Sequence, residues 1–301
     1  PEGIWPQSHQ WGMHDYTLEG AQGATSFNEI IASGYGQPQS AKEFADLAQW
    51  VNYDGHRSLF ESRSKNRMGL LMWMSHPCWP SMVWQTYDYY FEPTAAYFAI
   101  KKASEPLHIQ WNPATDDVEV VNYHAGRHPA LKARAQVLHM NGTVAWEKEV
   151  KVDSREDTTE KCIRLQFPDN LSEVHFIRLL LEENGKIVSE NFYHRSKVEN
   201  NYQALKQLPK VTLHTQAAYA KRADGEWTAR ITVENRTATP ALMIRLNVVG
   251  DEDGIQFLPV FYSDNYFALL PGESKVIHVR WKDVDTRGNK PLLKVSGYNV
   301  E

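Results

Sequence analysis

Residues 69–102 read GLLMWMSHPCWPSMVWQTYDYYFEPTAAYFAIKK, and this stretch sets the expected architecture of the N-terminal part of the chain. It begins within a short continuous apolar run, Met68–Met74, which is typical of a strand buried on both faces of a parallel sheet. A proline-containing loop follows. Pro93–Lys102 then has the pattern of a helix with proline in its first turn. Together these features predict an α/β unit.

The residues before this stretch predict helices and loops. Ser40 and Glu43 have the spacing of a capping box, and apolar residues then recur with helical period, so we expect a helix over Ala41–Arg63. The Gly- and Ser-rich residues 1–38 read mostly as loop. Within them a short helix is expected over Ser26–Ala32, capped by Ser26.

After Pro106 the pattern changes to short alternating runs separated by polar turns such as Asn141-Gly142 and Asn184-Gly185. Asn-Gly between apolar runs is a strong hairpin signal. Seven such runs in about 90 residues fit a β-sandwich. They are Leu107–Trp111, Val118–Tyr123, Lys132–His139, Val144–Val150, Lys161–Phe167, His175–Glu182 and Ile187–Tyr193.

Residues 198–209 read as a connector, and a second set of seven runs follows it. Turns at Asp224-Gly225 and Pro271-Gly272 separate some of them. This set predicts a second sandwich of similar size. Its runs are Val211–Ala218, Glu226–Asn235, Leu242–Val249, Leu258–Asp264, Tyr266–Leu270, Ser274–Trp281 and Leu292–Asn299.

Composition excludes several classes of protein. The 301 residues are 42% hydrophobic and 23% charged, which is globular, and the net charge of −5 argues against a nucleic-acid partner. No apolar stretch nears the ~20 residues of a membrane span. Cys78 and Cys162 are too few for a disulfide scaffold or a Cys-rich zinc site. His124 and His128 have a metal-like spacing but fall in a predicted turn. We expect neither a metal nor a cofactor.

Residues 69–102 resemble the end of the catalytic barrel in glycoside hydrolase family 2, in its exo-β-glucosaminidase and β-mannosidase branches. There the eighth strand reads roughly Gly-x-x-x-Trp-x-x-Asn-x-x-Trp-Pro, and an Asp-Tyr pair and a Pro-x-Ala-x-Tyr helix follow. This chain departs at His76, where the family often has Asn. The resemblance extends to Gly34-Tyr-Gly36, Asn191-Phe-Tyr193 and residues 261–273.

The resemblance implies a multidomain fold, namely a C-terminal remnant of a (β/α)8 barrel followed by two immunoglobulin-like β-sandwiches. The expected domains are residues 1–105, 106–204 and 205–301. Enzymes of this family cleave glycosidic bonds with two glutamates, one after an Asn on the fourth barrel strand and one on the seventh strand. Both are expected to lie upstream, so no catalytic residue is predicted here. Asn28-Glu29 reproduces the Asn-Glu pair, but loop-like residues precede it, which favours a capping or surface role.

The predicted substrate-binding residues are Trp73, Ser75, His76 and Trp79, at and just beyond the end of the expected eighth strand. Barrel active sites lie at this end of the strands, where an aromatic face can pack on a pyranose. Barrel core is the alternative for Trp73, and loop packing for His76 and Trp79. Trp84 and Asp88 read as structural. Another hypothesis places Trp5, Trp11 and His14 at an aglycone rim, and the alternative for them is a surface loop packed on its own aromatic side chains.

The sequence thus predicts the C-terminal part of a retaining exo-β-glycosidase that is inactive alone and meets its glycoside substrate through the full-length enzyme. The alternative is a non-catalytic carbohydrate-binding or structural module, for which Trp111, Trp146, Trp227 and Trp281 would have to form exposed platforms.

Self-association through exposed barrel surface is a further expectation. The resemblance implies a periplasmic or extracellular location, although no signal is visible.

Overall fold

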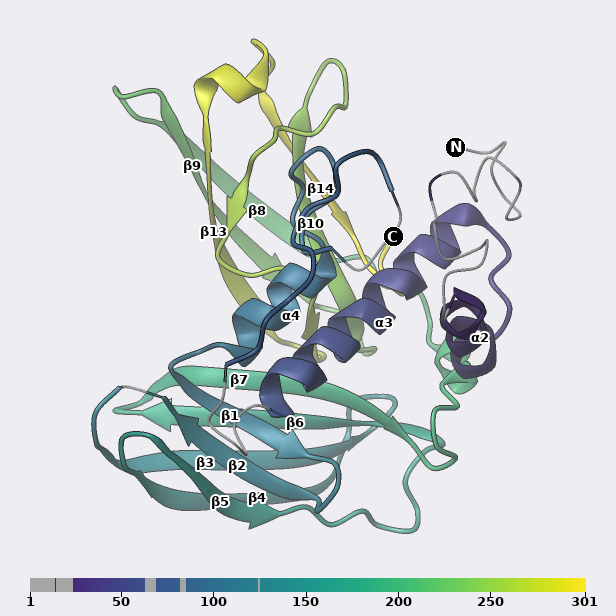
Figure 1. Cartoon of the computed structure of the whole chain (residues 1–301), viewed down its shortest axis with the longest axis vertical. Helices are drawn as coiled ribbons and strands as arrows, with labels where there is room; N and C mark the ends of the chain where they lie inside the picture. Colours follow the sequence, from purple (N-terminus) through teal and green to yellow (C-terminus); the bar gives the residue numbers. More distant parts are fainter. Residues whose placement is uncertain (1–13, 15–23, 63–68, 82–84, 124) are drawn as a thin grey trace.

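The computed structural model describes residues 14, 24–62, 69–81, 85–123 and 125–301. Three helices lie in the N-terminal part of this described chain: α2 (Ala24–Tyr35), α3 (Ala41–Ser62) and α4 (Ala95–Ala103). Strands follow from Leu107 onward and form two separate stacks of sheets (Figure 1). None of the described helices is long and apolar enough to cross a bilayer.

The first sandwich consists of two antiparallel sheets with the strand orders β4-β3-β6-β7 and β1-β2-β5. Their facing side chains form one core, to which β3 contributes Leu131, Ala133, Ala135 and Val137, each fully buried at every second position. All seven predicted strands are present. Their bounds are β1 Leu107–Asn112, β2 Asp117–Asn122, β3 His128–His139, β4 Val144–Ser154, β5 Thr158–Arg164, β6 Val174–Glu183 and β7 Lys186–Ser196.

The predicted Asn-Gly turns are formed. Asn184 and Gly185 connect β6 to β7 with φ angles of 50° and 77°, the left-handed pair that a tight hairpin needs. In the turn between β3 and β4, Gly142 has a φ angle of 87°. These turns fix the register of the long hairpins in this sheet.

The second sandwich has the sheet orders β11-β13-β9-β8 and β12-β10-β14. Trp281 lies at its centre with only 1% of its surface exposed. Here too the seven predicted strands are found. They are β8 His214–Lys221, β9 Glu226–Glu234, β10 Ala241–Gly250, β11 Phe261–Tyr262, β12 Phe267–Leu269, β13 Ser274–Lys282 and β14 Pro291–Ser296, with short 3-10 helices η3 Gln203–Gln207 and η4 Asp283–Thr286.

The capping box predicted for α3 is formed. The Glu43 amide donates to Ser40 Oγ at 3.1 Å, and Glu43 Oε2 accepts from the Gln39 amide at 2.7 Å. α2 differs from its prediction because it begins at Ala24, which leaves Ser26 inside the helix rather than at its cap. α4 begins at Ala95, whose amide donates to Gln49 Oε1 of α3 at 2.8 Å.

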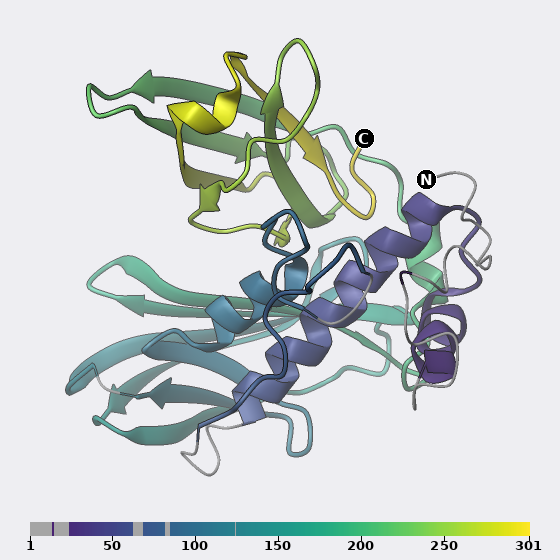
Figure 2. The same ribbon diagram turned by 45° about the horizontal axis from the view of Figure 1, so that its top comes forward.

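Helices α3 and α4 lie in the angle between the two sandwiches (Figures 1 and 2). A third hydrophobic core joins these parts, with Leu47 and Trp50 from α3, Phe176 from β6, Leu205 from η3 and Leu242 from β10. Burial of such side chains contributes about 1.5–3 kcal/mol each, so the helices and both sandwiches stabilise one another.

The strand predicted over Met68–Met74 is wrong for the residues that the structure describes. Residues 69–74 belong to no ladder, and Leu71 is fully exposed. The strand ladders of the described chain are all antiparallel, so a run suited to the middle of a parallel sheet has no neighbour here. Leu71, Trp73 and Met74 are exposed as a result, while Leu70 and Met72 are half-buried.

Candidate functional site

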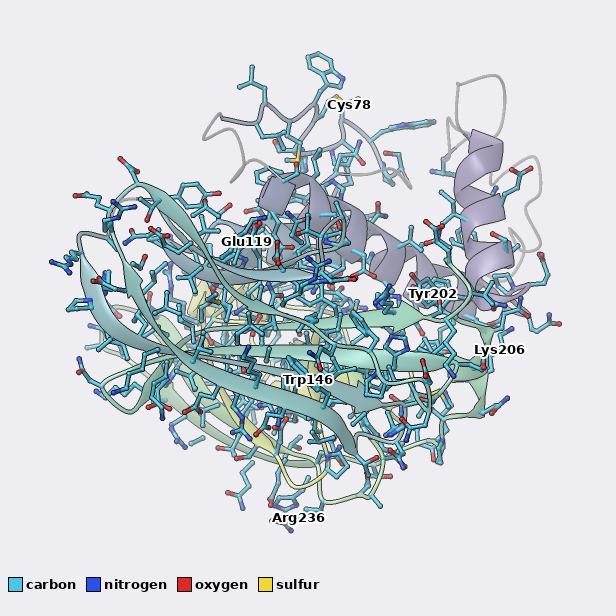
Figure 3. The ribbon with its side chains drawn as sticks, turned by 90° about the horizontal axis from the view of Figure 1, so that it is seen from below. Cys78, Glu119, Trp146, Tyr202, Lys206 and Arg236 are labelled. Carbon is cyan, nitrogen blue, oxygen red and sulfur yellow. The ribbon has the colours of Figure 1, made fainter. Side chains whose placement is uncertain are left out.

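The loop between α3 and α4 carries all four predicted substrate-binding residues. Trp73 is 80% exposed and Trp79 is 48% exposed, so neither lies in a core. Figure 3 places Cys78, between them in this loop, on a lobe that projects from the body of the molecule. Several further large apolar side chains are exposed on the same loop: Leu71, Met74, Tyr89, Tyr90 and Phe91.

His76 joins the two halves of this loop. Its imidazole stacks on the Phe91 ring with 4.5 Å between centroids and 13° between planes. The Tyr89 ring is also nearly parallel to the imidazole, at 6.5 Å between centroids and 16° between planes, and His76 Nε2 lies 3.4 Å from the Tyr89 carbonyl oxygen. The predicted polar residue is therefore set by an aromatic turn that comes about 15 residues later in the chain.

Trp79 is packed by His14, one of the residues assigned to an aglycone rim. The two rings stack at 5.4 Å and 21°, and His14 Nδ1 donates to the Pro80 carbonyl at 2.6 Å. The rim hypothesis also names Trp5 and Trp11, which lie outside the described residues.

Ser75 anchors the loop through its backbone. Its carbonyl oxygen accepts from the amides of Thr86 and Tyr87, both at 3.1 Å, and from Thr86 Oγ1 at 3.0 Å. Its side chain is exposed. Thr86 is in turn bonded to the residue before α4, because the Thr94 amide donates to the Thr86 carbonyl oxygen at 2.9 Å. These bonds hold the loop against the start of α4.

Asp88 organises the aromatic turn formed by residues 88–92. One carboxylate oxygen, Oδ1, accepts from the amides of Tyr90 and Glu92, each at 2.8 Å. This is the structural role predicted for Asp88; Trp84, predicted with it, lies outside the described residues. Phe91 within the turn has a φ angle of 67°, which is costly for a bulky side chain.

The chemical capacity of this loop is binding rather than acid–base catalysis. Exposed indole and phenyl faces can pack on the C–H face of a sugar ring, and His76 and Ser75 offer polar groups beside them. The two carboxylates of the aromatic turn are already engaged, Asp88 by backbone amides and Glu92 by Arg245.

Glu29 lies within α2, where its side chain is exposed and its carbonyl oxygen accepts from Ser33 Oγ at 2.6 Å. A glutamate that ends a barrel strand would follow an extended apolar run. The helical position supports the surface interpretation of Asn28-Glu29.

The four sandwich tryptophans do not form exposed platforms. Trp281 is buried, and Trp227 stacks on it at 6.0 Å and 2°. Trp111 and Trp146 are partly buried against the core of the first sandwich. This packing removes the feature that a carbohydrate-binding module built on the sandwich faces would need.

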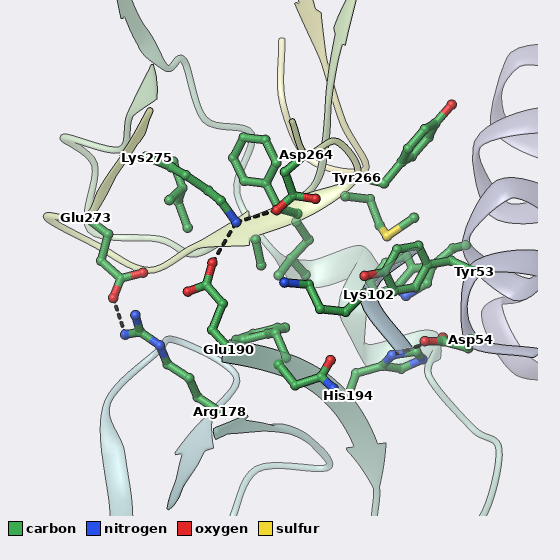
Figure 4. A pocket seen from close by; sticks show the side chains of 18 of the residues that line it. Tyr53, Asp54, Lys102, Arg178, Glu190, His194, Asp264, Tyr266, Glu273 and Lys275 are labelled. Atoms are coloured by element: carbon green, nitrogen blue, oxygen red, sulfur yellow. Dashed lines mark hydrogen bonds and ion pairs between the residues drawn. The ribbon is translucent and has the colours of Figure 1, made fainter. Parts of the chain in front are cut away.

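A hollow of about 240 Å³ lies where α3, α4 and both sandwiches meet. Figure 4 shows Lys275 from β13 between Glu190 of β7 and Asp264, and Arg178 of β6 paired with Glu273. Burial works to raise the pKa of Asp264, but the ammonium groups of Lys275 and Lys102 outweigh it and hold that pKa below its ordinary value. Two of these ion pairs, Lys275–Glu190 and Arg178–Glu273, join the two sandwiches, so they form an ionic seam between them.

A buried polar network fixes the C-terminal end of α3 to the first sandwich. Glu61 Oε1 accepts from Asn191 Nδ2 at 2.8 Å and from the Tyr193 hydroxyl at 2.9 Å, and it lies 3.2 Å from His108 Nε2. His108 Nδ1 lies 3.1 Å from Glu105 Oε2. Burial works to lower the pKa of His108, but the two carboxylates outweigh it and raise the pKa.

Sequence reasoning missed both the seam and this network. Their members are charged or amide residues at separate positions along the chain, and no spacing rule links them. The one available signal is Asn191-Phe-Tyr193, since both polar side chains of this motif converge on Glu61. Across the described residues, no group of three or more His, Cys, Asp or Glu side chains could hold a metal ion.

Comparison with known proteins agrees with this architecture. The sequence family described as "Exo-beta-D-glucosaminidase Ig-fold domain" matches residues 191–300. An exo-β-D-glucosaminidase from Streptomyces avermitilis is 31% identical over 91% of this chain and 34% of its own length. The corresponding enzyme from Arthroderma benhamiae is 28% identical over 91% of this chain and 33% of its own length.

Among solved structures, an exo-chitosanase from Amycolatopsis orientalis superposes with a TM-score of 0.90 and 25% identity, over 99% of this chain and 39% of that one. The chain thus spans about a third of the length of the curated relatives it matches. It resembles the C-terminal part of a glycoside hydrolase family 2 enzyme in the exo-β-glucosaminidase and β-mannosidase branch.

Proposed function

We propose that this chain is the C-terminal part of a retaining exo-β-glycosidase and supplies one wall of its sugar pocket. In this assignment residues 1–105 complete a (β/α)8 barrel, and residues 106–204 and 205–301 are two accessory immunoglobulin-like domains. The observation that carries the proposal is the row of exposed aromatic side chains on the α3–α4 loop, with Trp73 80% exposed. A soluble protein rarely leaves such a row uncovered unless something binds there.

The proposed chemistry divides between two parts of the enzyme. Two glutamates outside this chain perform the reaction: one protonates the leaving oxygen, and the other attacks the sugar carbon to form a covalent intermediate. Trp73 packs on the apolar face of the sugar, while His76, Ser75 and Trp79 line the wall beside it. Such contacts raise the rate only where they strengthen toward the transition state.

A hybrid enzyme tests this assignment. The chain would replace the corresponding third of the Streptomyces avermitilis exo-β-D-glucosaminidase, and turnover of p-nitrophenyl β-D-glucosaminide would be measured. We expect activity, and a loss of kcat/KM on the order of tenfold or more in Trp73→Ala, since each ~1.4 kcal/mol of lost contact is tenfold. Phe261→Ala, which removes an exposed aromatic on β11 of the second sandwich, is the matched control and should leave kcat/KM unchanged.

A folded hybrid without turnover, or one in which Trp73→Ala is as active as its parent, would contradict the assignment. Folding is checked by circular dichroism and a single thermal transition, so that an inactive hybrid is informative.

Self-association offers the isolated chain another way to cover the same aromatic loop. We propose that the chain alone forms dimers or larger species through the exposed aromatic side chains of this loop, since an exposed apolar surface tends to find a partner. Light scattering across a concentration series would measure this. A monomer at every concentration, with little binding of a hydrophobic dye, would contradict it.

A further inference from the structure

The second sandwich reaches the candidate sugar-binding loop through one ion pair. Arg245, in the middle of β10, pairs with Glu92 at the end of the aromatic turn. Both side chains are largely sheltered, with 31% and 21% of their surfaces exposed, so the pair is less screened than a surface salt bridge.

The second sandwich also contacts α4, which follows the turn directly, through residues 262–266. Lys101 Nζ donates to the carbonyl oxygens of Tyr262 and Ser263 at 3.1 and 2.7 Å. Phe98 packs on Tyr266 with 5.9 Å between ring centroids. Arg245 therefore projects from a surface that is itself fixed against the helix behind the turn.

Glu92 is fixed into the aromatic turn at both ends of its backbone. Its amide donates to Asp88 Oδ1 at 2.8 Å, and its carbonyl oxygen accepts from the Asp88 amide at 3.0 Å. Between these bonds lies Phe91, in its costly left-handed conformation. Such a conformation persists only where the surrounding structure holds it, and the Arg245–Glu92 pair is adjacent to it.

Phe91 in turn sets His76, because the two rings stack at 4.5 Å. A continuous line of contacts thus runs from β10 through Glu92 and Phe91 to a predicted substrate-binding residue. We propose that Arg245 is a positioning residue: through Glu92 it holds the aromatic turn so that Phe91 keeps the His76 imidazole oriented in the pocket wall. The pocket rests on the proposed function, whereas the line of contacts from Arg245 through Glu92 and Phe91 to His76, here called the brace, does not.

The test uses Arg245→Met in this chain, which keeps most of the side-chain volume and removes the charge. Amide hydrogen exchange of Tyr90 and Glu92 should become about tenfold faster or more, because the turn opens locally more often. The ring-proton NMR shifts of His76 should move toward those of a free imidazole as the stacked Phe91 ring leaves. Arg245→Lys keeps the positive charge, so its exchange rates and His76 shifts should lie between those of the parent chain and those of Arg245→Met.

Arg236→Met is the matched control, since Arg236 pairs with Glu234 in the same sandwich and lies on the side of the molecule opposite Cys78 (Figure 3). It should leave the turn and His76 unchanged. If Arg245→Met perturbs the fold of β10, Glu92→Gln breaks the same pair from the loop side and should give the same two changes.

The proposal would be contradicted by a folded Arg245→Met variant in which the exchange rates stay within about twofold of the parent chain and the His76 shifts are unchanged. In the hybrid enzyme, Arg245→Met should raise KM for the glucosaminide or lower kcat, with recovery in Arg245→Lys. Moved His76 shifts without any kinetic change would support the brace and contradict the pocket assignment, so the two failures are distinguishable.

Discussion

The first sandwich and the α3–α4 loop are both rich in apolar residues, but only the sandwich buries them. Phe176 and Ile177 on β6 are fully buried, whereas Trp73 and Phe91 on the loop are largely exposed. The sandwich strands pair with other strands, whereas residues 69–74 join none of the sheets formed by the described residues. An apolar run therefore predicts burial only when its neighbours are present, and an unburied one points to a surface that something else covers.

The largest effect should come from removing a buried aromatic. Phe176→Ala should lower the free energy of unfolding by about 3–5 kcal/mol, because it leaves a cavity in the core between α3 and the first sandwich. Trp73→Ala should lower it by less than about 1 kcal/mol, because its ring is already in water. Urea unfolding of both variants measures the contrast. Similar losses of unfolding free energy in the two variants would contradict the distinction between the buried core and the exposed loop.

Loss of the buried polar network between α3 and the first sandwich should lower the free energy of unfolding almost as much. Glu61→Ala leaves the Tyr193 hydroxyl, Asn191 and His108 without their shared acceptor, and should cost about 3 kcal/mol.

Glu147→Ala is the control for Glu61→Ala. Glu147 pairs with Arg134 on the exposed face of the same sandwich, and its loss should cost less than about 1 kcal/mol. Equal losses in the two variants would show that the buried network does not hold the helix.

Two buried histidines of the first sandwich should give pH effects of opposite sign. His175 lacks carboxylate partners of the kind that flank His108, and burial lowers its pKa to about 4. Because the unfolded chain takes up this proton near pH ~6.5, stability falls between pH ~6.5 and ~4, by up to about 3 kcal/mol. His175→Gln should remove this loss, measured by urea unfolding from pH ~7 to ~4. An unchanged acid slope in the variant would contradict it.

His108 should act in the other direction. Its folded pKa is raised, so its ion pairs contribute fully below the unfolded value of ~6.5, and this stability is lost as pH rises through the folded value. The stability difference between the parent chain and His108→Gln should therefore shrink toward alkaline pH. A difference that grows with pH would mean that His108 is neutral in the folded protein.

The sandwiches could be predicted because their signals are local. Alternation places Leu131, Ala133 and Ala135 on one face whatever the rest of the chain does, and Asn184-Gly185 selects its own turn. The capping box of α3 is equally local. The prediction over Met68–Met74 failed because a buried parallel strand is defined by its neighbours and not by its own residues.

The candidate site divides in the same way. Trp73, Ser75, His76 and Trp79 were identified by their place in a motif, and their role in binding stays a prediction. The supports around them could not be foreseen. His76 depends on Phe91, and Phe91 depends on Arg245 more than 150 residues away, through contacts that only the folded chain brings together.

The most direct test of the account is the turnover of chromogenic β-glucosaminide, β-mannoside and β-galactoside by this polypeptide alone. The account assigns it a pocket wall without the two catalytic carboxylates, so no hydrolysis above the uncatalysed rate is expected, even at high protein concentration. Measurable turnover that disappears in Glu29→Gln would show that the chain carries its own acid and would contradict the division between wall and catalyst.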